Sequence, residues 1–151
     1  MNGDKRTGGI NMKRVYLASP FFEEYEIDLV KQVEEILIDK GLDVFSPMRH
    51  PREDLVKGSR HWAIENFVNN LKFINASDLV VAIYHGQYSD SGTAWEIGYC
   101  YGTQTPVVTV HFGEISNLMV TEGSHANLTL EELKQYDFNK LISSFYTGRM
   151  I

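Results

Sequence analysis

The segment "DLVVAIY", residues 78–84, limits the possible folds more than any other part of the chain. After Asp78 every residue in it is apolar or aromatic, with no polar residue at alternate positions. A strand of this kind is covered on both faces, which is typical of a central strand in a parallel sheet. The chain must therefore supply other elements to cover both faces of that sheet.

Strand-like and helix-like segments alternate along the rest of the chain. Short apolar runs end near Pro20 and Pro47, and the longer stretches between them repeat apolar residues at helical spacing. The spacing of Thr129 and Glu132 is that of a capping box and predicts one more short helix. The pattern predicts strands at 14–19, 42–47, 78–84 and 105–112, and helices at 23–40, 62–75 and 91–102.

The predicted fold is α/β, a single doubly wound parallel sheet with helices on both faces. Its second helix carries a clear apolar stripe. That stripe consists of Ile64, Phe67, Val68, Leu71 and Ile74. With 151 residues, of which 43% are hydrophobic, the chain can bury one substantial core. We expect a domain over residues 13–151, preceded at 1–12 by a disordered leader or cloning remnant.

Charge and cysteine content exclude several classes of partner. The net charge is −6 and the 14 lysines and arginines are scattered, which argues against a nucleic-acid polymer. The single cysteine, Cys100, excludes a disulfide framework and favours a cytoplasmic protein. No apolar run approaches the roughly 20 residues that cross a bilayer, so no membrane partner is expected.

The candidate site lies where the connecting loops gather, beyond the carboxyl ends of the strands. The loop after the third strand holds Asp90, and Glu96 follows in the next helix, with Gly92 between them. The start of a helix favours an ionised carboxylate, so Glu96 is a candidate nucleophile or base. Alternatively, Glu96 points outward and Asp90 only caps the helix.

Several motifs resemble those of the nucleoside 2-deoxyribosyltransferase family and occur in the same order as in that family. They are "VYLASPFF", "NNLKFINASDLVVAIY", "DSGTAWEIGY" and the tail "FNKLISSFYTGRMI". The most specific piece is D-x-G-x-x-x-E-[IL]-G, formed here by Asp90, Gly92, Glu96, Ile97 and Gly98. The resemblance implies a flavodoxin-like fold and exchange of the base on 2-deoxynucleosides, with free nucleobases as co-substrates and with neither metal nor cofactor.

The resemblance also implies roles for individual residues. Glu96 would be the nucleophile, forming a covalent glutamyl-deoxyribosyl intermediate that gives net retention. Tyr16 would orient this carboxylate, and Asp90 would bind a sugar hydroxyl. Ala18 would meet the sugar through its backbone, and Phe21 would stack on the base.

The sequence departs from the family pattern around the base. Asn70 stands where many members have an aspartate that assists protonation of the base. Asparagine can hydrogen-bond a base edge but cannot deliver a proton at neutral pH. The family glutamine after the second strand has no clear counterpart, and Arg49 and His50 stand in that region.

The segment "GSHANLTL" corresponds to one that, in relatives, reaches into a neighbouring subunit's site with an asparagine. Asn127 or His125 could fill that role, so the resemblance implies a homo-oligomer with shared active sites.

Two other functions stay open at this point. One is hydrolysis of nucleosides or nucleotides by an enzyme of the same superfamily, and the other is a nucleotide-binding module without catalysis. "ASPFFEEYE" is apolar and acidic apart from Ser19, which disfavours a bound phosphate.

Overall fold

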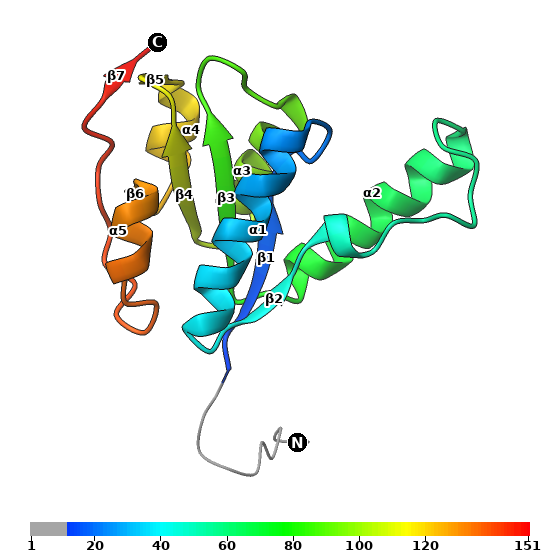
Figure 1. The fold of residues 1–151 in the computed structure, drawn as a ribbon, viewed down its shortest axis with the longest axis horizontal. Coiled ribbons are helices and arrows are strands. Elements are labelled where there is room, and N and C mark those ends of the chain that lie inside the picture. Colours follow the sequence, from blue (N-terminus) through cyan, green and yellow to red (C-terminus); the bar gives the residue numbers. More distant parts are fainter. Residues whose placement is uncertain (1–11) are drawn as a thin grey trace.

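The computed structural model describes residues 12–151 and contains the predicted doubly wound parallel sheet (Figure 1). The expected leader lies outside the described residues except for Met12. Five strands pair in the order β2-β1-β3-β4-β6, which is the flavodoxin-like order. The strands are β1 (Arg14–Ala18), β2 (Asp43–Phe45), β3 (Leu79–His85), β4 (Val107–Phe112) and β6 (Ala126–Leu128).

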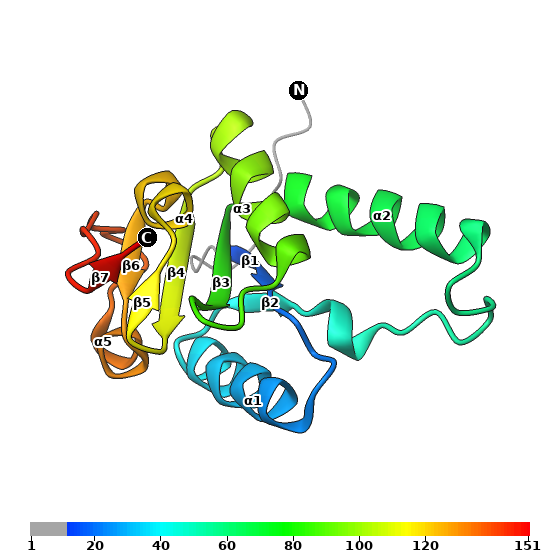
Figure 2. The same ribbon diagram turned by 90° about the horizontal axis from the view of Figure 1, so that it is seen from above.

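Helices cover both faces of this sheet, as the apolar character of β3 requires (Figure 2). Helices α1 (Glu24–Asp39) and α5 (Leu130–Gln135) pack on one face, against Val15, Leu17 and Val81. Helices α2 (Arg60–Asn75), α3 (Ser91–Gly102) and α4 (Leu118–Gly123) lie on the other, where Tyr16 and Ala18 point. Between residues 12 and 151, no helix combines the length and the apolar character needed to cross a membrane.

Helix α2 runs out beyond the edge of the sheet and leaves much of its apolar stripe uncovered (Figure 1). It begins at Arg60, where the Ser59 hydroxyl caps it by accepting a hydrogen bond from the Trp62 amide at 3.1 Å. The predicted helix is confirmed, but Ile64, Phe67 and Val68 of its apolar stripe are 46–57% exposed. Apolar periodicity predicts a helix, but it does not predict whether the apolar face of that helix is buried by other parts of the same chain.

The C-terminal third contains elements that the sequence pattern did not predict. Strand β6 and helix α4 are short, and a separate pair of two-residue strands, β5 (Ile115–Ser116) and β7 (Arg149–Met150), ties down the C-terminus. Outside the C-terminal third, the sequence pattern also did not predict a single 3₁₀ turn, Pro47–Arg49, which follows β2. Segments this short show no detectable hydrophobic period. Strand β6 is recognised only by its parallel pairing with β4.

Candidate active site

The centre of the site is a pair of buried polar atoms. Glu96 lies in the second turn of α3, and Tyr16 lies in the middle of β1 on the face that α3 covers. The Tyr16 hydroxyl and Glu96 Oε2 are both inaccessible to solvent, and neither has a hydrogen-bond partner of good geometry in the described residues. Buried polar atoms are normally satisfied, so this pair is suited to receive a ligand.

Burial controls the ionisation of this pair. Loss of solvent raises the pKa of Glu96 to about 7, the nearby Tyr16 hydroxyl opposes the shift, and the charge of Asp90 adds to it. The start of a helix favours an ionised carboxylate, whereas burial of Glu96 acts in the opposite direction. Burial, and then the charge of Glu96, raises the pKa of Tyr16, so its hydroxyl remains a proton donor.

Asp90 caps α3 with one of its two carboxylate oxygens. Its Oδ2 accepts hydrogen bonds from the Thr93 amide and the Thr93 hydroxyl, each at 2.7 Å. The capping alternative is therefore present in the structure. Oδ1 has no such bond among the described residues and is left for another donor. A Cβ on Gly92 would lie 3.3 Å from Asp90 Oδ2, so a larger residue there would crowd the cap.

Glu96 opens into a cavity of about 330 Å³. Gly92, Trp95 and Glu96 of α3 line one side, and Phe67, Asn70 and Leu71 of α2 line the other. We call this the carboxylate cavity. The rings of Phe67 and Trp95, which line this cavity, lie 5.6 Å apart and are about half exposed.

A second cavity of about 330 Å³ lies between α2 and the loops that follow β1 and β2. We call it the aromatic cavity, and its walls include Phe21, Phe45, His50, Trp62 and Asn70. Asn70 lines both cavities, so it lies between the cavity that contains Glu96 and the cavity that contains Phe21. Ala18 is the buried last residue of β1, where it pairs with Ala82 at the carboxyl end of the sheet.

The structure does not bring Asn127 or His125 to this region. The Asn127 amide donates to the carbonyl oxygens of Thr121 and Ser144 at 3.1 and 3.0 Å, and its Oδ1 lies 2.7 Å from His111 Nε2. His125 Nε2 lies 2.6 Å from the Leu141 carbonyl oxygen. Both side chains are bound within their own chain, so reaching a neighbour's site would require these hydrogen bonds to break.

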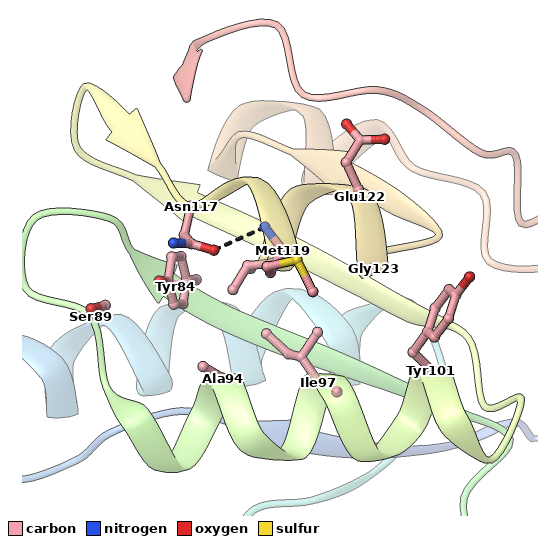
Figure 3. Close-up of a pocket in the computed structure, with 11 residues that line it drawn as sticks. Tyr84, Ser89, Ala94, Ile97, Tyr101, Asn117, Met119, Glu122 and Gly123 are labelled. Atoms are coloured by element: carbon pink, nitrogen blue, oxygen red, sulfur yellow. Dashed lines mark hydrogen bonds between the residues drawn. The ribbon is translucent and has the colours of Figure 1, made fainter. Parts of the chain in front are cut away.

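A third cavity, of about 710 Å³, lies on another face of α3 (Figure 3). Ala94, Ile97 and Tyr101 of α3 face Met119 of α4 across it. Asn117 Oδ1 accepts a hydrogen bond from the Met119 amide at 2.9 Å and caps α4. This cavity could not be predicted from the sequence, because the short helix α4 carries no readable apolar period.

The raised pKa of Glu96 predicts a pH-dependent cost to stability. From its ordinary value of 4.5 to about 7, the folded state binds more protons than the unfolded state, so the free energy of unfolding falls as pH rises. Glu96→Gln removes this cost. We expect the variant to be more stable than wild type at pH 8 by up to about 3 kcal/mol, with the gain shrinking toward pH 5.

Urea denaturation at the two pH values measures this difference, with the exposed Glu131→Gln as matched control. A gain of equal size at pH 5 and pH 8 would show that the Glu96 carboxyl does not have a raised pKa.

Sequence and structure comparisons agree on one family. A profile of nucleoside 2-deoxyribosyltransferases matches residues 15–135. A nucleoside deoxyribosyltransferase of Lactobacillus leichmannii is 25% identical over 151 residues, covering 90% of this chain and 96% of the relative. Another nucleoside deoxyribosyltransferase, from Limosilactobacillus fermentum, is 27% identical over 154 residues, covering 89% of this chain and 92% of the relative.

A solved structure of a 2-deoxyribosyltransferase from Bacillus psychrosaccharolyticus is 38% identical and superposes with a TM-score of 0.82. The match covers 88% of this chain and 98% of that one. The profile spans Tyr16, Asn70, Asp90 and Glu96, of which Asn70 and Glu96 line the carboxylate cavity. Profile, relatives and fold together show that the chain belongs to the nucleoside 2-deoxyribosyltransferase family.

Proposed function

We propose that this protein transfers 2-deoxyribose between nucleobases through a covalent ester on Glu96, with net retention at the anomeric carbon. The observation that carries the proposal is the buried pair of Tyr16 and Glu96, whose polar atoms lack good hydrogen-bond partners beside an open cavity. Family membership supports the substrates, which are 2-deoxynucleosides and free nucleobases.

In the first step the ionised Glu96 attacks C1′ of the sugar as the bond from C1′ to the base nitrogen breaks. In the second step another base attacks C1′ and releases the carboxylate. Each step inverts the anomeric carbon, so the product retains the original configuration, as in retaining glycosidases. The protonated Tyr16 hydroxyl would hold the attacking carboxylate in place by donating to it.

Asp90, Ala18 and Phe21 would bind the rest of the donor. Asp90 Oδ1, which is not used in capping, would accept a hydrogen bond from a sugar hydroxyl. Gly92 leaves room beside the Asp90 carboxylate. The backbone at Ala18, at the carboxyl end of β1, would meet the sugar. Phe21 lines the aromatic cavity and would stack on the base.

We also propose that the protein acts as a homo-oligomer with shared sites. The half-exposed Ile64, Phe67 and Val68 form an apolar face on α2. Contiguous exposed apolar surface of this kind usually marks a contact with another protein. Because Asn127 and His125 are held within their own chain, we assign the neighbour's contribution to contacts with the α2 face that borders the carboxylate cavity.

A chromatographic assay with deoxyinosine, with and without adenine, tests the reaction class. Transfer predicts deoxyadenosine when adenine is present. Hypoxanthine released equally with and without adenine, with no deoxyadenosine, would identify a hydrolase. No turnover would identify a binding module. Either of these outcomes contradicts the proposal.

Introducing an acid at position 70 is expected to speed cleavage of purine donors. Asn70 lines both cavities, so a carboxyl in its place would lie between nucleophile and base. We expect Asn70→Asp to raise kcat with deoxyadenosine by roughly tenfold and to add a new titration to the pH profile. Asn139→Asp adds the same charge on an exposed loop and serves as control. Unchanged rate and pH profile would give Asn70 a structural role.

A further inference from the structure

Asn70 leaves the departing base without an acid, and the structure points to another group that can supply it. We propose that His50 is the residue that protonates the leaving base and deprotonates the incoming one. The inference rests on the proposed transfer reaction and names the acid–base group of that same site. It follows from three observations on the loop after β2.

The first observation separates the two candidates in this loop. Arg49 turns toward α1, where its Nε and Nη2 bind the Glu34 carboxylate at 3.0 and 2.9 Å. This two-point contact fixes the guanidinium on an acid that is itself buried. His50 instead lines the aromatic cavity together with Asn70. Arg49 is therefore structural, and His50 is the neighbour that can reach a base.

The second observation is that an aromatic stack holds the imidazole in place. The His50 ring lies parallel to the Phe45 ring, with centroids 4.7 Å apart and planes 8° apart. Phe45 in turn stacks on Phe73 of α2 at 3.6 Å and on Tyr16 at 5.9 Å. Phe45 therefore contacts both the imidazole and the tyrosine beside the nucleophile, and its stack on His50 restricts rotation of the His50 ring.

The third observation is that both ring nitrogens of His50 are unoccupied. Within residues 12–151 no hydrogen bond or ion pair engages them, whereas the four other histidines all have polar partners. His61 pairs with Glu65, His85 accepts from the Tyr88 amide, and His111 and His125 are bonded as described above. His50 is exposed, so its imidazole can exchange protons with water.

Three charged side chains line the aromatic cavity beside His50, namely Arg52, Glu53 and Lys57. Arg52 is held by Asp54 at 2.9 Å and by Glu65 at 3.4 Å. The α2 residues that line this cavity are Trp62 and asparagines, none of which titrates near neutral pH. Among the described residues that line this cavity, His50 is the side chain best suited to move a proton at that pH.

The proton balance of the reaction is complete with this assignment. As the C1′–N bond breaks, its electron pair stays on the base, a Glu96 oxygen bonds to C1′, and the imidazolium proton of His50 moves to a ring nitrogen of the base. A neutral base leaves and a neutral imidazole remains. When the second base attacks C1′, the same imidazole takes its proton and Glu96 regains its charge.

A donor that needs no proton provides the test. 7-Methyl-2′-deoxyguanosine already carries a positive charge on its base, which leaves as a neutral molecule. We expect His50→Gln to lower kcat with deoxyadenosine by about 100-fold, and to change kcat with 7-methyl-2′-deoxyguanosine by less than about threefold. His61→Gln, also exposed but outside both cavities, is the matched control and should leave both rates unchanged.

A second variant tests the same role by rescue. Adding Asn70→Asp to His50→Gln should recover at least about tenfold of the lost rate with deoxyadenosine, because a carboxyl then replaces the missing acid. Equal losses with both donors, or no loss with either, would overturn the assignment while wild type still exchanged bases. If wild type itself transferred no deoxyribose, the proposed function would fail first, so the two failures are distinguishable.

Discussion

Glu96→Ala is expected to lower kcat for base exchange by about four orders of magnitude or more. The substitution removes the group that forms the ester, and no other carboxylate lines the carboxylate cavity among the described residues. The protein should still fold, because the side chain that is lost carries an unsatisfied buried oxygen rather than a stabilising contact. Initial rates of deoxyadenosine formation from deoxyinosine and adenine measure the effect.

The matched control is Glu131→Ala. Glu131 is an exposed carboxylate on α5, on the opposite face of the sheet, and it pairs only with Lys134 at 2.9 Å among the described residues. We expect its rate to equal that of wild type. Base exchange retained in a folded Glu96→Ala variant would remove Glu96 from the mechanism.

Selectivity for deoxyribose is expected to be large as well. Attack at C1′ passes through an oxocarbenium-like state, which a 2′-hydroxyl destabilises by withdrawing electrons. Tyr16 and Glu96 would also crowd that position of the sugar. We expect kcat/KM for deoxyinosine to exceed that for inosine by at least about 100-fold, or roughly 2.7 kcal/mol of barrier difference.

Both donors are compared in one enzyme preparation with adenine as acceptor. The ratio of their kcat/KM values reports the difference in transition-state binding and is insensitive to binding energy that both donors share. Comparable values would mean that the site accepts ribose and deoxyribose alike, and the family's preferred sugar would not apply to this chain.

The main sheet could be predicted from sequence because its signals are local. The uninterrupted apolar run of β3 required cover on both faces, and α3 occupies the predicted range 91–102. Thr129 and Glu132 form the predicted capping box. Strand β6 could not be predicted in this way, because its three residues depend on pairing with β4 and on the hydrogen bonds of Asn127.

The identity of the central site residue could be predicted from a motif, but the properties that depend on packing could not. The motif around Glu96 marked the residue, but the raised pKa depends on how deeply β1 and α3 bury the carboxylate. The sequence offered Arg49 and His50 as equals. Packing separates them, because Glu34 on α1 binds Arg49 while His50 lines the aromatic cavity. The exposure of Phe67 likewise depends on where α2 leaves the sheet.

The covalent step on Glu96 is the central claim, and intact-protein mass spectrometry tests it most directly. Protein incubated with deoxyinosine alone should gain the mass of one 2-deoxyribosyl group, and peptide mapping should place that group on Glu96. Adding adenine should remove the adduct and yield deoxyadenosine. Rapid base exchange with no adduct on wild type, or an adduct on another residue, would contradict the mechanism.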